Sequence, residues 1–269
     1  MLEKIKKSIA FINRHIKILP KVGIISGSGL GNIAENIDQI ASLDYQDIPH
    51  FPVSTVEGHN GKLIFGRINS VNIAILQGRI HFYEGYGMEE IIYPVRVLKF
   101  LGIDFLIATN ASGGLNPDFH PGDLMIHTDH INLMPNPLIG KYFKEFGERF
   151  PDMTNAYDTQ LKDKLFSLSE KLGISVQSGC YVSVTGPTLE TPSEYNYLRL
   201  IGGDAVGMST VPEIIVARQM GIRCAAISVI TNMGIDKKTE TTTHQEVLQI
   251  AELAAPKLSL LLRHLIGEL

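Results

Sequence analysis

The 269-residue sequence contains no tryptophan, only two cysteines, and no apolar stretch of the about 18 residues that a membrane-spanning helix needs. Cys180 and Cys224 each begin an apolar, strand-like run, which is typical of small buried thiols in a reducing compartment rather than of a disulfide framework. Residues 1–19 have apolar positions at helical spacing, but charges interrupt them too often for a signal peptide. These features predict a soluble cytoplasmic protein with an N-terminal docking helix.

Concentrated positive charge and clusters of metal-ligating residues are also missing. The net charge is −4 at pH 7 and the 24 lysines and arginines are scattered, whereas a nucleic-acid-binding protein normally carries a basic face. His127 and His130 follow a strand-like run, with no cysteine or carboxylate cluster nearby to complete a coordination shell. We therefore expect no nucleic-acid or membrane partner, no metal, and structural roles for both histidines.

The chain is nevertheless rich enough in apolar residues, at 44%, to bury a substantial core. Strand-like runs alternate with helical patterns from end to end, and no linker, repeat or shift of composition divides them. We predict one α/β domain over residues 1–269, with a central mixed, mostly parallel β-sheet surrounded by helices. The expected strands are residues 22–26, 63–68, 71–76, 105–109, 124–127, 180–184 and 224–230, the second and third of which form an antiparallel hairpin across Asn69 and Ser70.

Three helix starts are predicted by capping boxes, in which a hydroxyl residue precedes a glutamate by three positions. They are Thr191 with Glu194, Thr210 with Glu213, and Thr243 with Glu246. Two stretches without a clear assignment, residues 131–157 and 232–242, are long enough to be functional or interfacial loops.

The first chemical motif is GSGLG at residues 27–31, which follows a strand-like run. Its amides and the Ser28 hydroxyl suit an anion at a helix N-terminus. It lacks the third glycine of a dinucleotide fingerprint, because Asn32 stands there, and it lacks the lysine of a nucleotide P-loop. A tight strand-to-helix turn is the alternative interpretation.

The second motif is QGRIHFYEG at residues 77–85. If the strand continues past Gly78, alternation places Arg79, His81 and Tyr83 on one side, and a guanidinium fork is well matched to phosphate. Alternatively, Arg79 pairs with Glu84 and His81 is a structural histidine.

Further polar residues follow other apolar runs. The amide of Ala111 and the hydroxyl of Ser209 are candidate anion donors, although residues 110–114 also suit a plain glycine-rich turn. Glu190 offers a carboxylate that accepts from a heterocycle N–H, and Asn232 offers a carboxamide that both donates and accepts. Purely structural roles in a helix start and a turn are the alternatives, and His244 is either a site residue or exposed. No Gly-x-Ser-x-Gly elbow supports a covalent serine.

In this order the segments SGSGLG, QGRIHFYEGY, TNASGGLNP, DHINL, FGERFPDM, YVSVTGPTLET, DAVGMSTVPEIIVAR and ITN resemble the trimeric purine nucleoside phosphorylases, over residues 22–244. The resemblance implies a purine-salvage glycosyltransferase (pentosyltransferase) that reversibly phosphorolyses 6-oxopurine (deoxy)ribonucleosides, such as inosine and guanosine, to free base and (deoxy)ribose 1-phosphate. It implies a cytoplasmic homotrimer with inorganic phosphate as co-substrate and no cofactor.

The resemblance also assigns residues to roles. The implied phosphate site is Ser28, His59, Arg79, His81, the Ala111 amide and Ser209. The implied nucleoside site is Tyr83, Phe146 donated by the neighbouring subunit, Glu190, Val206, Met208, Asn232 and His244. The implied catalytic residues are Asn232, which binds the purine as N7 gains a proton, Glu190, which accepts from N1–H, and His81.

Leu189 and Met233 stand where some branches of that family have phenylalanine and lysine, so the base preference, including xanthosine, stays open. Within the same fold, a methylthioadenosine phosphorylase or a hydrolytic nucleosidase is the alternative. A non-catalytic nucleoside- or phosphate-binding protein and a nicotinamide oxidoreductase are the alternatives from other classes, the latter disfavoured by the broken glycine spacing.

Overall fold

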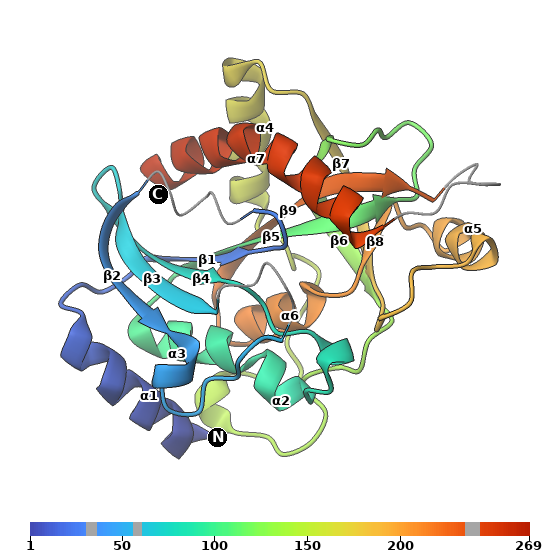
Figure 1. Ribbon diagram of the computed structural model, residues 1–269. Helices are drawn as coiled ribbons and strands as arrows, with labels where there is room; N and C mark the ends of the chain where they lie inside the picture. Colours follow the sequence, from blue (N-terminus) through green and yellow to red (C-terminus); the bar gives the residue numbers. More distant parts are fainter. Residues whose placement is uncertain (31–36, 56–60, 235–242) are drawn as a thin grey trace.

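The computed structural model describes residues 1–30, 37–55, 61–234 and 243–269, and within them one mixed sheet runs through the molecule (Figure 1). The strand order is β2-β3-β4-β1-β5-β8-β7-β6-β9, and β5 also pairs with β9, which closes the last five strands into a barrel-like ring. The strands are β1 Val22–Ser26, β2 Asp38–Asp44, β3 Lys62–Ile68, β4 Val71–Gln77, β5 Phe105–Gly114, β6 Leu124–Asn132, β7 Val176–Ser183, β8 Ala205–Gly207 and β9 Arg223–Met233. The predicted α/β class and mixed sheet are confirmed.

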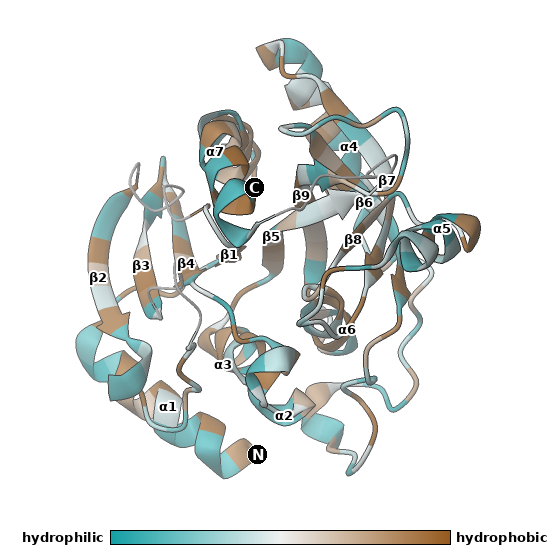
Figure 2. Ribbon diagram, turned by 45° about the vertical axis from the view of Figure 1, so that its right-hand side comes forward, coloured by the Kyte–Doolittle hydropathy of each residue, from teal (hydrophilic) through white to brown (hydrophobic). Residues whose placement is uncertain are grey.

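Helices cover the sheet on both sides (Figures 1 and 2). One layer holds α1, α2, α3 and α6, and the other holds α4 and α7. The helices are α1 Leu2–His15, α2 Met88–Ile91, α3 Tyr93–Leu101, α4 Thr159–Leu172, α5 Pro192–Leu200, α6 Val211–Gln219 and α7 His244–Gly267, with short 3-10 turns η2 Tyr45–Asp47, η3 Phe82–Glu84 and η4 Lys144–Phe146.

Successive side chains of the central strands point to opposite faces of the sheet and pack in two separate hydrophobic cores. In β1, Ile24 packs with α4 and α7 while its neighbour Ile25 packs with α1, α3 and α6. In β5, Ile107 and Leu106 divide in the same way. Successive side chains of a strand point to opposite faces, so central strands covered on both sides are apolar throughout. This rigid double layer holds the strand ends in place.

The antiparallel hairpin of β3 and β4 forms as predicted, and Asn69 in its turn adopts φ +54°. The capping boxes at Thr191 and Thr243 are both present, with each hydroxyl accepting from the backbone N–H three residues on. The N-terminal helix α1 docks through buried Ile5 and Ile12.

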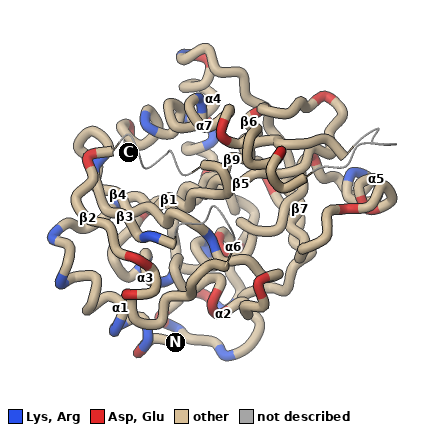
Figure 3. Tube along the Cα trace, viewed as in Figure 1, with Lys and Arg blue, Asp and Glu red and all other residues tan. Residues whose placement is uncertain are grey.

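Charge is dispersed over the chain. Figure 3 shows lysines and arginines interspersed with aspartates and glutamates along the outer helices and loops. Among the described residues, none of the helices is both long and apolar enough to cross a membrane.

Candidate active site

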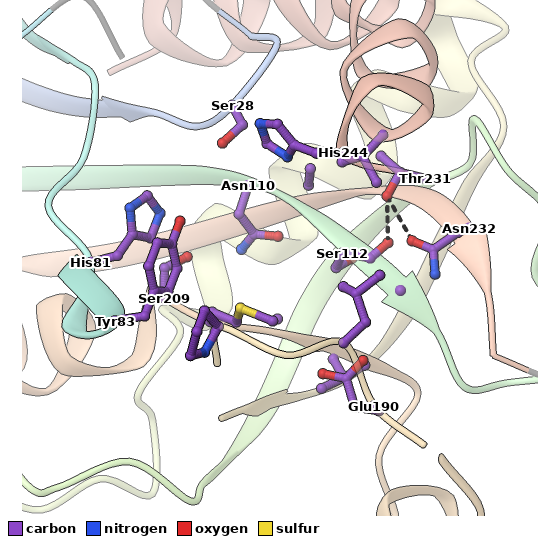
Figure 4. A pocket seen from close by; sticks show the side chains of 18 of the residues that line it. Ser28, His81, Tyr83, Asn110, Ser112, Glu190, Ser209, Thr231, Asn232 and His244 are labelled. Carbon is purple, nitrogen blue, oxygen red and sulfur yellow. Dashed lines mark hydrogen bonds between the residues drawn. The ribbon is translucent and has the colours of Figure 1, made fainter. Parts of the chain in front are cut away.

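A pocket of about 390 Å³ opens where the carboxyl ends of four strands meet (Figure 4). Parallel strands β1, β4, β5 and β9 bring their C-terminal ends to the same edge, which is where an open α/β sheet binds its ligand. The lining residues are Ser28, Arg79, His81, Tyr83, Asn110, Ala111, Ser112, Gly113, Pro187, Leu189, Glu190, Tyr195, Val206, Gly207, Met208, Ser209, Thr231, Asn232, His244 and Val247.

The segment after β4 reaches this pocket by a different backbone path from the one predicted. The strand ends at Gln77, and Gly78 has φ +111°, a left-handed value that glycine tolerates and that turns the chain out of the sheet. The strand therefore does not continue past Gly78, and the condition on which the alternation depended is not met. Arg79, His81 and Tyr83 nevertheless all line the pocket.

Arg79 is buried, with 4% of its surface exposed. Its Nε donates to Glu213 Oε1 at 2.8 Å and its Nη1 donates to the Thr109 carbonyl at 3.0 Å. The alternative pairing of Arg79 with Glu84 is wrong. A buried carboxylate and a carbonyl thus hold the guanidinium plane at the edge of the pocket, in a geometry suited to an anion.

His81 is oriented by Glu84. Its backbone N–H donates to Glu84 Oε1 at 2.7 Å, and its Nδ1 lies 3.1 Å from the same oxygen. Burial raises the pKa of Glu84, but hydrogen bonds from His81 and Thr55 outweigh it and lower the pKa to about 2. Because an ionised carboxylate only accepts, Nδ1 is the donor in this contact, which fixes the orientation of the ring. The ring of Tyr83 stacks on His81 at 4.7 Å between centroids.

Thr210 does not cap α6 as predicted. Its backbone has φ +73°, a strained value for a β-branched residue, and its hydroxyl accepts from Asn110 Nδ2 at 2.8 Å instead of from the helix. Glu213, the expected partner in the capping box, pairs with Arg79. The unusual turn places Ser209 in the pocket, with its hydroxyl 3.3 Å from that of Thr210.

A chain of buried hydrogen bonds connects Asn110, the partner of Thr210, with residues further inside the protein. Ser228 Oγ donates to Asn110 Oδ1 at 2.7 Å and lies 2.6 Å from Nε2 of His127. Nδ1 of His127 and Nδ1 of His130 lie 3.3 and 3.2 Å from the Tyr157 hydroxyl. The predicted structural role of both histidines fits these contacts, and no group of three or more His, Cys, Asp or Glu among the described residues could hold a metal ion.

Burial makes His127 a source of acid sensitivity. Burial, followed by the charges of His130 and Arg79, lowers its pKa to about 3, whereas an unfolded histidine has a pKa of about 6.5. The folded state therefore binds fewer protons, so stability from His127 is present above about pH 6.5 and is lost progressively toward pH 3. At pH 5 the expected loss is about 2 kcal/mol. When the free energy of unfolding in urea is measured at pH 8 and pH 5, His127→Gln should lose less stability between the two pH values than the unsubstituted protein, by about 2 kcal/mol.

The matched control is His15→Gln, because His15 is exposed on α1. That variant should follow the pH dependence of the unsubstituted protein. Identical pH dependence in His127→Gln and the unsubstituted protein would contradict the assignment.

The opposite end of the pocket carries Glu190 and Asn232 (Figure 4). The Thr231 hydroxyl lies 3.1 Å from Asn232 Oδ1 and 3.2 Å from the Ser112 carbonyl, and Asn232 Nδ2 lies 3.4 Å from the Tyr195 hydroxyl. Glu190 is half-buried; burial raises its pKa, and a hydrogen bond from Tyr195 acts in the opposite direction. One carboxylate and one carboxamide therefore face the same space.

The segment after Thr109 is a strand rather than the alternative glycine-rich turn. β5 continues to Gly114, pairing with β9 and, at Gly113 and Gly114, with β8. A side chain at Gly113 would lie 3.3 Å from Asn232 Nδ2. The glycine thus keeps this end of the pocket open, and Ala111 lines it from the strand.

Of the remaining predicted site residues, one lies outside the described part of the chain and one does not line the pocket. His59 lies outside the described residues. Phe146 is 2% exposed and packs in its own chain's core, with the Arg96 guanidinium 4.0 Å from its ring centre and Phe100 and Phe143 alongside. Reaching a neighbouring subunit's site would require it to leave this core.

Several lining or supporting residues were missed from the sequence. They are Glu84, Asn110, Tyr195, Thr210, Glu213 and Thr231. Thr231 and Asn110 carry a usable signal, since each is a polar residue that closely follows an apolar run of the sequence. Tyr195 lies inside a helix that begins at a capping box, and nothing local distinguishes it from an ordinary helical residue.

The fold and the pocket define an α/β protein in which an arginine, a histidine and hydroxyl groups lie in one pocket with a carboxylate and a carboxamide. A model of the phosphorylase superfamily matches residues 21–267, and the chain belongs to that superfamily. It is 50% identical to purine nucleoside phosphorylase 1 of Bacillus subtilis (strain 168) over 253 residues, which cover 94% of this chain and 93% of that protein. The resemblance seen in the sequence is confirmed at the level of the family.

Solved structures agree. A purine nucleoside phosphorylase of Schistosoma mansoni in complex with adenosine is 39% identical, with a TM-score of 0.95, over 100% of this chain and 98% of that chain. A structure of Schistosoma mansoni purine nucleoside phosphorylase in complex with inosine is 38% identical, with a TM-score of 0.94, over 100% and 97% of the two chains.

Proposed function

We propose that this chain is a purine nucleoside phosphorylase that acts on 6-oxopurine ribonucleosides and deoxyribonucleosides such as inosine and guanosine. The products are the free base and the pentose 1-phosphate. The observation that carries the proposal is that one pocket holds Ser28, His81 and Ser209 near one end and Glu190 and Asn232 at the other (Figure 4). With phosphate at the first end and the purine at the second, the sugar of the nucleoside would lie between them.

Phosphate is the co-substrate and the nucleophile, and the chemistry needs no further cofactor. The proposed phosphate ligands are Ser28, His59, Arg79, His81, the Ala111 amide and Ser209. A phosphate oxygen forms a bond to the anomeric carbon while the bond to the purine N9 breaks and its electron pair passes to the base. The sugar is oxocarbenium-like between these events, so the adjacent dianion stabilises it. Holding both reactants in one pocket supplies the rest of the acceleration.

The leaving base is stabilised at its far edge. Asn232 hydrogen-bonds N7 as that atom gains a proton, and Glu190 accepts from N1–H. Tyr83, His244 and the backbone of Met208 bind the sugar hydroxyls, and Val206 and Met208 pack against the base. This assignment is supported by the position of these six residues around the pocket.

The base preference follows from Glu190. A carboxylate needs a donor, and N1 of inosine or guanosine carries a hydrogen while N1 of adenosine offers only a lone pair. Leaving a carboxylate unpaired against that lone pair is costly, so we expect a preference of at least about 100-fold in kcat/KM for inosine over adenosine. Since burial raises the pKa of Glu190, the preference should weaken as the pH falls and the carboxyl becomes protonated.

The test is an assay of inosine, guanosine, xanthosine and adenosine with and without inorganic phosphate. Hypoxanthine should be released from inosine only when phosphate is present. Release without phosphate would indicate a hydrolytic nucleosidase, and comparable efficiency on adenosine would refute the role of Glu190.

The proposal includes a single domain over residues 1–269, a cytoplasmic location and assembly as a homotrimer. The exposed apolar side chains of Ile139 and Phe150, at 82% and 89%, support an interface at the loop that contains them. The donation of Phe146 to a neighbouring site stays a prediction, which its burial in its own chain does not favour.

A further inference from the structure

Tyr195 occupies a place between the two residues proposed to bind the purine. It lies on α5, is half-buried, and lines the pocket. Its hydroxyl is 3.4 Å from Asn232 Nδ2 and is also hydrogen-bonded to Glu190. The carboxylate, the phenol and the carboxamide therefore form a continuous row along one wall.

The order of this row matches the order of polar positions on a purine. The C6 substituent of a purine projects between N1 and N7. If Glu190 meets N1 and Asn232 meets N7, the group between them meets the substituent on C6. The Tyr195 hydroxyl is that group.

A hydroxyl has one proton to donate and lone pairs to accept, and this count suits an oxygen on C6. In the protein without substrate, the hydroxyl donates to Glu190 and accepts from Asn232 Nδ2. When N1–H of the base takes over the carboxylate, the hydroxyl proton is released to turn toward O6, while the bond from Asn232 is kept. N1–H then has Glu190 as acceptor, and the Tyr195 hydroxyl has O6.

We propose that Tyr195 is a specificity-determining residue of the base subsite, whose hydroxyl donates to the C6 oxygen of a 6-oxopurine. This inference rests on the proposed function. Tyr195 would thus recognise the C6 oxygen directly, in addition to the recognition of N1–H by Glu190.

Neighbouring backbone holds the Tyr195 ring in this position, and neighbouring side chains keep its hydroxyl protonated. A side-chain carbon at Gly234 would overlap the Tyr195 ring, so that glycine lets the chain after β9 lie against the ring face. A side-chain carbon at Gly113 would lie 3.5 Å from the hydroxyl, which shows how closely the phenol approaches β5. Burial and the adjacent Glu190 raise the pKa of Tyr195, so the hydroxyl keeps the proton that it must donate.

The experiment compares Tyr195→Phe with the unsubstituted protein by measuring the dissociation constants of hypoxanthine and of unsubstituted purine in the presence of phosphate. Purine has the same ring but carries hydrogen at C6. A hydrogen bond of ordinary net strength corresponds to an affinity change of about three- to tenfold. Hypoxanthine binding should weaken by that factor, and purine binding should change by at most about twofold.

Tyr197→Phe is the matched control, because Tyr197 lies two residues further along α5 and is 54% exposed. It should change neither constant. Equal weakening of both ligands by Tyr195→Phe would overturn the proposal and indicate that Tyr195 only positions Glu190 and Asn232. Unchanged hypoxanthine binding would overturn it as well. Because these are binding measurements, they are separate from phosphate-dependent turnover of inosine, whose absence would instead refute the proposed function.

Discussion

Replacement of Asn232 by alanine is expected to lower the turnover of inosine at saturating phosphate by about 10²- to 10³-fold, the usual cost of removing one preorganised group from a site of developing charge. The electron pair of the broken glycosidic bond moves into the purine, and N7 takes up a proton as it does so. Asn232 is the group that we propose hydrogen-bonds N7, and its amide is oriented by Thr231 on one side and Tyr195 on the other. Steady-state kinetics with inosine and phosphate measure the effect.

The fold should survive this change, because Asn232 is only half-buried at the end of β9. Asn196→Ala, at an exposed position on α5, is the control and should have normal turnover. The decisive pattern is a large fall in kcat with little change in the thermal midpoint. Near-normal turnover in Asn232→Ala would remove the residue from the mechanism.

The location of the site was predictable from the sequence because it depends on strand ends. Ser28 follows β1, Arg79 follows β4, and Ala111 and Asn232 lie in the last residues of β5 and β9. Apolar runs that stop at polar residues are visible in a sequence, and parallel strands bring such stops to one edge. The positions of Glu190 just before the cap of α5 and of His244 at the first residue of α7 were visible for a similar local reason, the capping box.

Features that depend on contacts distant in the sequence were not predictable. Thr210 and Glu213 have the spacing of a capping box, but Glu213 pairs with Arg79, which is 134 residues away along the chain. Thr210 instead bonds Asn110, 100 residues away. The local preference is weak in comparison with pairing a buried charge, so tertiary structure decides. Tyr195 enters the site for a comparable reason, through contacts made by the whole face of α5.

The pair of Arg79 and Glu213 connects stability with the proposed phosphate site. Both side chains are almost fully buried, at 2% and 4% exposure, and the guanidinium also lines the pocket. A buried cation without a counter-ion is strongly unfavourable, whereas a cation held by one carboxylate can still receive an incoming dianion. Glu213 thus stabilises buried Arg79 and, in the proposed function, orients it for the phosphate.

Glu213→Ala is therefore expected to lower the free energy of unfolding by about 3–5 kcal/mol, the range found when one partner of a buried ion pair is removed. The loss should be smaller for Glu213→Gln, which keeps an acceptor for Arg79 Nε. Added phosphate should restore part of the stability of the alanine variant, because the ligand supplies the missing negative charge. Urea unfolding with and without phosphate measures both effects. Glu3→Ala removes an exposed pair with Lys6 and should change the unfolding free energy little; an equally small change in Glu213→Ala would show that the buried pair does not hold Arg79 in place.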